Sequence, residues 1–296
     1  MAIHRHILHN GEIRLASEPA LYAGQLGLLA GWGVFSTLRV QDTQLFAWER
    51  HWARMSKDAR LLNVPMPADP DRVEHDLLKL LAANEISTAH GGKCTVRIVI
   101  VRNTGGLWEG PSTGLASDTI ALTANMKEWG ATVRLDIQPH GRYAASEFAT
   151  AKVLSWAANL RWAERAQQNG FDETILLNER GTIAECTSAN IFAICGNEVF
   201  TPPLTDGCLP GVTREVILGE IHVPGVTISE RTLTIEDLYA ADEVCITSST
   251  RDLLSVREIA GREINHRGDV TARLSRAFGA YVAEDVARRG RTTLVA

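Results

Sequence analysis

Two hydrophobic periods alternate along the chain, and this alternation constrains the fold more than any other feature. Strand-like alternation of apolar and polar residues occurs in both halves, and stretches with helical periodicity lie between the strands. The predicted strands span 94–102, 118–124, 133–137, 173–178, 182–194, 198–201 and 243–247, and the predicted helices span 49–62, 155–168, 213–221 and 270–288. Because strands and helices are interspersed in both halves, the sequence predicts an α+β protein with two subdomains.

Turn and cap residues mark the start of several elements. Asn10-Gly11 between two apolar stretches predicts a hairpin. Glycines at the start of residues 31–40 predict a tight turn that leads into a strand. Asp69 followed by Pro70 predicts the start of a further helix, and Thr234-Ile235-Glu236-Asp237 resembles a capping box.

Net charge and the lengths of the apolar stretches argue against a nucleic-acid partner and against a membrane segment. A net charge of -5 over 296 residues offers no basic surface, so we expect no nucleic-acid partner. No apolar stretch is long enough to span a bilayer and none follows the N-terminal charges, so we expect neither a membrane segment nor a signal peptide.

Cysteine and histidine placement argues against a metal site. The five cysteines are scattered, odd in number and without a Cys-x-x-Cys pair, which favours a reducing cytoplasm over a disulfide framework. His4, His6 and His9 alternate in a terminal strand, where histidines are more often solvated or packed than metal-bound. We expect no metal.

Lysine is scarce, and one lysine is isolated. Five of the 30 basic residues are lysine, and Lys152 is the sole lysine after Lys127. Arginine keeps its charge, whereas a lysine amine can lose its proton and form a Schiff base. A bias toward arginine explains the scarcity but not the position, because Lys152 stands between a strand-like stretch and a helix, where catalytic groups often lie.

Polar groups that suit an anion or a cation follow Lys152 in the chain. Glu185 lies in an otherwise apolar strand, where a carboxylate is costly to bury without a partner. A glutamate on the solvated side of that strand is the alternative. Residues 209–214 lead into a helix whose N-terminal amides suit a phosphate, and 247–250 form a second turn of this kind. Either turn can equally be a simple helix cap or strand end.

Together these motifs resemble the fold type IV pyridoxal 5'-phosphate (PLP) enzymes, the class IV aminotransferases. The most specific stretches are Glu185-Cys186-Thr187-Ser188-Ala189-Asn190-Ile191-Phe192, Thr201-Pro202-Pro203 and Leu209-Pro210-Gly211-Val212-Thr213-Arg214. His51-Trp52-Ala53-Arg54-Met55 matches a His-x-x-Arg-Leu element with methionine for leucine. The resemblance covers nearly the whole chain. It implies a fold type IV architecture with a first subdomain at 1–125, an interdomain loop at 126–131 and a second subdomain at 132–296, and it implies a homodimer.

The resemblance also implies a role for each motif residue. Lys152 would be the Schiff-base lysine and proton shuttle, and Glu185 would pair with the pyridine nitrogen of PLP. The phosphate would be held by Arg54, the main-chain amides of Val212 and Thr213, and Ser249. The substrate would lie near Phe35, Arg39, Arg97, Trp108 and Thr250. From the residues alone, the favoured interpretation of Arg54 is a surface arginine that pairs with Asp58 one helical turn later.

The subgroup within the family stays open. Arg39 and Arg97 match arginines of branched-chain aminotransferases, but Ala30 and Thr95 stand where those enzymes carry tyrosine. Residues 31–37 are closer to the lyases and D-amino-acid aminotransferases, yet Leu107-Trp108-Glu109 lacks the arginine that both subgroups carry in this loop.

From the resemblance we expect an aminotransferase, similar to the branched-chain enzymes, that moves an amino group between an amino acid or amine and a 2-oxo acid. The alternatives are a 4-amino-4-deoxychorismate lyase that releases pyruvate, a D-amino-acid or R-amine transaminase, and an inactive homologue.

Overall fold

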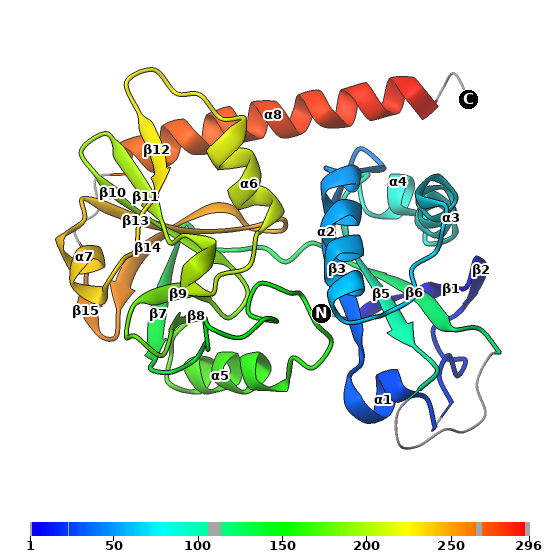
Figure 1. Cartoon of the computed structure of the whole chain (residues 1–296). Helices are drawn as coiled ribbons and strands as arrows, with labels where there is room; N and C mark the ends of the chain where they lie inside the picture. Colours follow the sequence, from blue (N-terminus) through cyan, green and yellow to red (C-terminus); the bar gives the residue numbers. More distant parts are fainter. Residues whose placement is uncertain (1, 23, 106–113, 265–267, 294–296) are drawn as a thin grey trace. The chain divides into compact units, whose positions relative to one another are not determined.

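Each of the two units into which contacts divide the chain has its own β-sheet (Figure 1). The computed structural model describes residues 2–22, 24–105, 114–264 and 268–293. The first unit comprises Met1–Lys127, Lys152–Trp156 and Glu284–Ala296, and the second comprises Glu128–Ala151 and Ala157–Ala283. The first unit thus includes two segments that the sequence assigned to the C-terminal subdomain.

The sheet of the first unit is antiparallel throughout. Its strand order is β2-β1-β6-β5-β3-β4. The predicted hairpin is confirmed, because Asn10 and Gly11 both adopt positive φ between β1 and β2, as a tight hairpin turn requires. The strands are β1 (Ile3–His9), β2 (Glu12–Leu15), β3 (Gly33–Gln41), β4 (Gln44–Leu45), β5 (Cys94–Arg102) and β6 (Ser117–Ala124).

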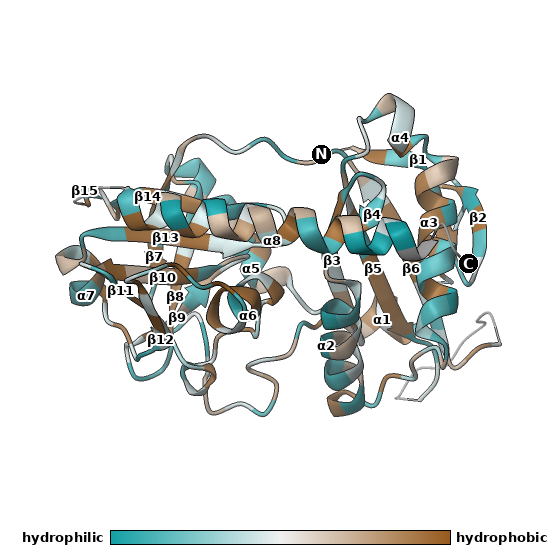
Figure 2. Ribbon diagram, turned by 90° about the horizontal axis from the view of Figure 1, so that it is seen from above, coloured by the Kyte–Doolittle hydropathy of each residue, from teal (hydrophilic) through white to brown (hydrophobic). Residues whose placement is uncertain are grey.

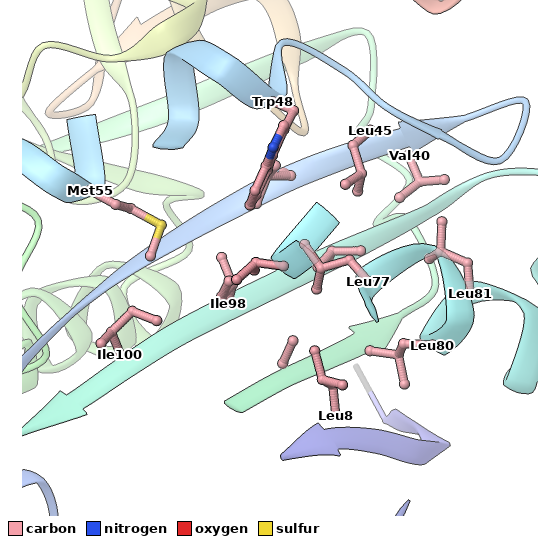
Figure 3. Close-up of a cluster of buried hydrophobic side chains, with 14 of the residues drawn as sticks. Leu8, Val40, Leu45, Trp48, Met55, Leu77, Leu80, Leu81, Ile98 and Ile100 are labelled. Carbon is pink, nitrogen blue, oxygen red and sulfur yellow. The ribbon is translucent and has the colours of Figure 1, made fainter. Parts of the chain in front are cut away.

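Two long helices cover this sheet, α2 (Trp48–Leu61) and α3 (Pro70–Ala83). The predicted cap of α3 is confirmed, because the Asp69 carboxylate accepts the N–H groups of Asp71 and Arg72 at 3.0 Å. The short helices α1 (Leu26–Ala30) and α4 (Ile86–Ala89) complete the unit. Figure 3 shows apolar side chains of α2, α3, β3 and β5 gathered in one core.

Strand alternation gives the two faces of β3 and β5 different chemistry. Val34, Leu38 and Val40 of β3 point into the core with their apolar neighbours on β5. Phe35 and Arg39 therefore lie on the opposite face. Arg97 of β5 shares that face, because it pairs with Thr37 in the register.

The second unit contains a mixed sheet of nine strands. Its order is β12-β11-β10-β13-β14-β7-β8-β9, with β15 paired to β14, and the pairs β11/β12, β14/β7 and β7/β8 are parallel. The strands are β7 (Thr132–Gln138), β8 (Glu173–Leu177), β9 (Ile183–Cys186), β10 (Asn190–Cys195), β11 (Glu198–Thr201), β12 (Thr227–Glu230), β13 (Glu243–Ser248), β14 (Asp252–Ile259) and β15 (Arg262–Glu263).

The helices associated with the second unit include α5 (Ala157–Gln168), η1 (Leu204–Asp206), α6 (Val212–Gly219) and α7 (Ile235–Ala240). The capping box at Thr234 and Asp237 is confirmed. The last helix, α8 (Asp269–Thr293), alternates between hydrophilic and hydrophobic colour along its length (Figure 2). Among the helices of the described residues, none is both long and apolar enough to cross a bilayer.

Tertiary contacts override two of the sequence predictions. The single strand predicted at 182–194 is wrong, because β9 and β10 are separated by a turn in which the hydroxyl groups of Thr187 and Ser188 donate to Glu173. The helix predicted from Ser155 begins two residues later, at Ala157, since the residues before it pair with β3. The strands β12 and β14 were not predicted.

The core of the first unit predicts which leucine matters for stability. Leu77 of α3 is fully buried, whereas Leu61 at the end of α2 is 41% exposed. We expect Leu77→Ala to lower the free energy of unfolding by about 2–5 kcal/mol, because it removes buried methyl groups and leaves a cavity. Leu61→Ala should change it by less than about 0.5 kcal/mol. Urea denaturation of the two variants checks this, and equal midpoints would contradict the packing.

Candidate active site

The main chain of Lys152 is joined to the edge of β3. The Phe35 N–H donates to the Lys152 carbonyl at 3.2 Å, and the Leu154 N–H donates to the Gly33 carbonyl at 3.0 Å, on either side of a bridge between Val34 and Val153. A Cβ on Gly33 would lie 2.4 Å from the Ile100 carbonyl oxygen and 2.5 Å from a Leu154 methyl group. Glycine at this position therefore lets the main chain of β5 approach β3 closely, and it leaves room for the Leu154 side chain.

Aromatic rings and a second cation surround the amine of Lys152. Its Nζ lies 4.6 Å from the centroid of the Phe35 ring and 5.7 Å from that of Trp156. The two rings meet edge to face with centroids 5.8 Å apart. On the same ring of Phe35, the Arg97 guanidinium lies 4.3 Å from the centroid, and burial lowers the pKa of Arg97. The structure therefore brings together Lys152, Phe35 and Arg97, which the sequence predicted as site residues.

Arg54 is held on the other face of β3 by buried polar partners. Its guanidinium donates to Ser36 Oγ at 2.9 Å, and Ser36 Oγ lies 2.7 Å from His51 Nδ1. Burial, and then the charges of Arg54 and Lys152, hold the pKa of His51 well below its usual value, so the imidazole is neutral. Since a guanidinium only donates, Ser36 accepts from Arg54 and its own proton is left for His51 Nδ1.

Arg54 and Asp58 are both buried, so the surface ion pair that the residues alone favoured for Arg54 is wrong. The Asp58 carboxylate accepts the main-chain N–H of Lys152 at 3.0 Å. Burial raises the pKa of Asp58, and the hydrogen bond from Lys152 and the charges of Arg54, Lys57 and Lys152 act in the opposite direction. Arg39 is buried on the Phe35 face of the sheet.

Glu185 is buried in β9 of the second unit, which contradicts the alternative of an exposed glutamate. Arg142 donates to one carboxylate oxygen. The other oxygen accepts from the Asn190 side chain at 3.3 Å and from the Leu209 N–H at 3.1 Å. An ionised carboxylate offers about four acceptor positions, so three donors leave room for a fourth.

The N-terminus of α6 is linked to Glu185 through Asn190 and Leu209, which both donate to the Glu185 carboxylate. Asn190 also donates to the Leu209 carbonyl, at 2.9 Å, and a Cβ on Gly211 would lie 2.1 Å from the Asn190 carbonyl oxygen. Gly211 is the N-cap of α6 and supplies no side-chain cap, so the amides of Val212 and Thr213 have no acceptor within the helix.

Buried hydroxyl groups accompany these amides. Within the described part of the chain, Thr213 Oγ1, Thr247 Oγ1 and Ser248 Oγ have no hydrogen-bond partner. Thr213 is in the first turn of α6, and α6 packs against β13, which ends with Thr247 and Ser248. Unsatisfied donors of this kind, together with helix N-terminal amides, suit an oxyanion such as a phosphate.

A buried ion pair supports the turn after β13. The Arg251 guanidinium donates to Glu173 at 3.0 Å and to the Ser188 hydroxyl at 2.8 Å, and it lies 4.1 Å from the centroid of the Trp129 ring. The turn is closed by the Arg251 N–H, which donates to the Ser248 carbonyl at 3.2 Å. Ser249 and Thr250, both predicted site residues, lie in this turn.

The predicted residues thus fall into two groups. Phe35, Arg39, Arg54, Arg97 and Lys152 belong to the first unit, and Glu185, Val212, Thr213, Ser249 and Thr250 belong to the second. Trp108 lies outside the described residues.

Sequence reasoning gave no role to Ser36, Asp58, Arg142 or Trp156. Only Asp58, one helical turn after Arg54, and Trp156, four residues after Lys152, carried a signal in their spacing. Ser36 and Arg142 carried none.

Comparison with known proteins identifies the family. The sequence profile of amino-transferase class IV matches residues 33–259. A putative branched-chain-amino-acid aminotransferase of Methanocaldococcus jannaschii is 29% identical over 259 residues, which cover 85% of this chain and 88% of that protein. The branched-chain-amino-acid aminotransferase of Escherichia coli K12 is 26% identical over 297 residues, 94% of each chain.

Solved structures agree with the fold. A crystal structure of the Escherichia coli branched-chain amino acid aminotransferase superimposes with a TM-score of 0.83 at 24% identity, over 94% of this chain and 95% of that one. The PLP-bound form of a hypothetical aminotransferase from Mycobacterium tuberculosis gives a TM-score of 0.78 at 22% identity, over 95% of this chain and 99% of that one. The predicted fold type IV architecture is confirmed, and the chain belongs to the class IV aminotransferase family.

Proposed function

We propose that this aminotransferase depends on pyridoxal 5'-phosphate and moves an amino group between an amino acid or amine and a 2-oxo acid, in the manner of the branched-chain enzymes. Lys152 would bind the cofactor covalently and carry the proton to and from the substrate carbon. When bound, PLP supplies an electron sink for the carbanion that forms as this proton leaves. The amino group is passed on in two half-reactions.

The observation that carries the proposal is the environment of Lys152. Its main chain is held by β3 on one side and by Asp58 on the other, so the side chain starts from a defined point. Its amine lies over the Phe35 ring, on the sheet face that also carries Arg97. A catalytic amine needs this kind of positioning, since small misplacements cost large factors in rate.

The second unit supplies groups that fit the other parts of the cofactor. We assign the phosphate to the amides of Val212 and Thr213 and to Ser249, and the unpaired hydroxyl groups described above support an oxyanion there. The family resemblance adds Arg54 of the first unit to the phosphate ligands. Glu185 would accept a hydrogen bond from the protonated pyridine nitrogen at its fourth acceptor position, while Arg142 donates to the carboxylate and orients it.

Substrate recognition is assigned to Phe35, Arg39, Arg97 and Thr250. Arg39 and Arg97 can pair with a carboxylate, which suits amino acids and 2-oxo acids. The Phe35 ring offers an apolar surface beside both Arg97 and the Lys152 amine.

By the family resemblance we also propose a homodimer in the cytoplasm. A monomeric mass in solution at micromolar concentration would contradict the dimer.

The half-reaction tests the type of chemistry. We expect purified protein loaded with PLP to be yellow, an amino donor alone to remove the colour, and a 2-oxo acid to restore it. Absorbance spectroscopy with a panel of amino acids and amines, followed by 2-oxoglutarate or pyruvate, measures this. If no donor changes the colour while 4-amino-4-deoxychorismate releases pyruvate without an acceptor, the lyase replaces our proposal.

The site of attachment is tested in the same preparation. Borohydride reduction followed by peptide mapping should place the pyridoxyl group on Lys152. Lys57, Lys79, Lys93 and Lys127 act as internal controls, and a label on one of them instead would refute the assignment.

Glu185 tests the role of the buried carboxylate. We expect Glu185→Gln to retain PLP but to lower turnover by about two orders of magnitude or more, because a preorganised negative partner is lost. The matched control is Glu179→Gln, since Glu179 is also a carboxylate that accepts main-chain N–H groups, from Ala144 and Ala145. Measurement of kcat for both variants at saturating PLP tests this expectation. Equal turnover in both variants would remove Glu185 from the site.

Arg54 tests the phosphate contact. We expect Arg54→Ala to raise the dissociation constant of PLP by about tenfold or more, because charge-assisted hydrogen bonds to phosphate are lost. Arg60→Ala, an exposed arginine on the same helix, is the control and should bind as the unchanged protein does. Equilibrium dialysis of PLP against both variants measures this. Cofactor retention that is the same in both would show that Arg54 is not a phosphate ligand.

A further inference from the structure

A buried aspartate holds the main chain of the lysine that we propose as catalytic. Asp58 is on α2 and is 3% exposed, and its carboxylate accepts the Lys152 N–H at 3.0 Å. The two residues are 94 positions apart in the chain. This hydrogen bond joins α2 to the short segment that also pairs with β3.

The hydrogen bond to Asp58 differs in kind from the other contacts that hold this segment. The hydrogen bonds that join Lys152 to Phe35 and Leu154 to Gly33 run between main-chain groups and do not depend on the side chains. The bond to Asp58 depends on one side chain, and it fixes the N–H on one side of the Lys152 Cα while the bond from Phe35 fixes the carbonyl on the other. The direction of the Lys152 Cα–Cβ bond is set by these two contacts together.

A carboxylate at this place has an energetic cost that a neutral acceptor would avoid. Burial raises the pKa of Asp58, which shows that the environment disfavours its charge. The compensation comes from the Lys152 N–H and from three charged groups, Arg54, Lys57 and Lys152, while the neighbouring His51 is neutral. A charged acceptor holds an N–H about twice as strongly as a neutral one. The negative charge of Asp58 therefore strengthens the hydrogen bond to the Lys152 N–H, and the nearby cations offset part of the cost of burying this charge.

We propose that Asp58 is the positioning residue of Lys152: it sets the main chain of Lys152 against β3, so that the amine is delivered over the Phe35 ring. The inference rests on the proposed function of Lys152 as the lysine that binds PLP. Asp58 itself touches neither cofactor nor substrate in this account.

The first experiment measures the hydrogen bond directly. Amide hydrogen exchange of the cofactor-free protein, resolved to single residues by fragmentation mass spectrometry, reports the Lys152 N–H. We expect exchange to be about tenfold or more faster in Asp58→Ala, since a buried hydrogen bond is lost. Asp58→Asn keeps an acceptor oxygen and should retain most of the protection, which also guards against a variant that fails to fold.

A matched control separates this effect from the loss of any buried aspartate. Asp285 of α8 accepts the Ala47 N–H at 2.9 Å and is also buried. Asp285→Ala should expose the Ala47 amide and leave the Lys152 amide unchanged. The inference is overturned if Lys152 exchanges as slowly in Asp58→Ala as in the unchanged protein, or as fast in Asp58→Asn as in Asp58→Ala.

The second experiment measures positioning. PLP is added to cofactor-free protein, the attachment is trapped with borohydride at intervals, and the label on Lys152 is quantified. We expect attachment about tenfold slower in Asp58→Ala, with near-normal rates in Asp58→Asn and Asp285→Ala. An unchanged rate in Asp58→Ala overturns the positioning role. A label on another lysine in the unchanged protein refutes the proposed function instead, and the exchange result still decides whether Asp58 holds the Lys152 main chain.

Discussion

The pairing of residues 152–154 with the edge of β3 is the contact on which the candidate site depends. Two main-chain hydrogen bonds and one bridge remove this segment from the unit of its sequence neighbours and make it part of the first unit. Gly33 leaves room for the Leu154 side chain, and the Asp58 carboxylate accepts the main-chain N–H of Lys152. A lysine side chain has many rotamers, so its placement depends on how firmly its main chain is held.

The sequence predicted the elements whose conformation is set by short-range interactions. The hairpin at Asn10-Gly11, the cap at Asp69 and the capping box at Thr234 were confirmed because turn and cap residues act over three or four positions. The strand predicted at 182–194 was wrong because a turn interrupts it. The hydroxyl groups of this turn donate to Glu173, which lies on another strand. Non-local contacts of this kind leave no periodic signal in the sequence.

The candidate site shows the same division. Lys152 and Glu185 could be proposed as site residues from the sequence, because an isolated lysine and a carboxylate in an apolar strand are unusual in themselves and the family motifs coincide with them. Their partners were not found. Asp58 lies 94 positions from Lys152, and Arg142 lies 43 positions from Glu185, so only the folded chain relates them. Asp58 was assigned to the solvated face of α2, because its spacing from Arg54 is that of a surface ion pair.

Arginine and lysine occupy different kinds of position in this structure. Arginine occupies the places where a positive charge must persist in buried or half-buried surroundings: Arg54 beside Ser36, Arg142 beside Glu185, and Arg251 beside Glu173. Arginine as a residue type carries a permanent charge, and its planar fork fits carboxylate and phosphate oxygens. An amine that must release and regain a proton needs the opposite property, and lysine provides it. The one lysine after Lys127 stands where the proposed chemistry requires proton exchange, so the choice between the two cations follows the task of each position.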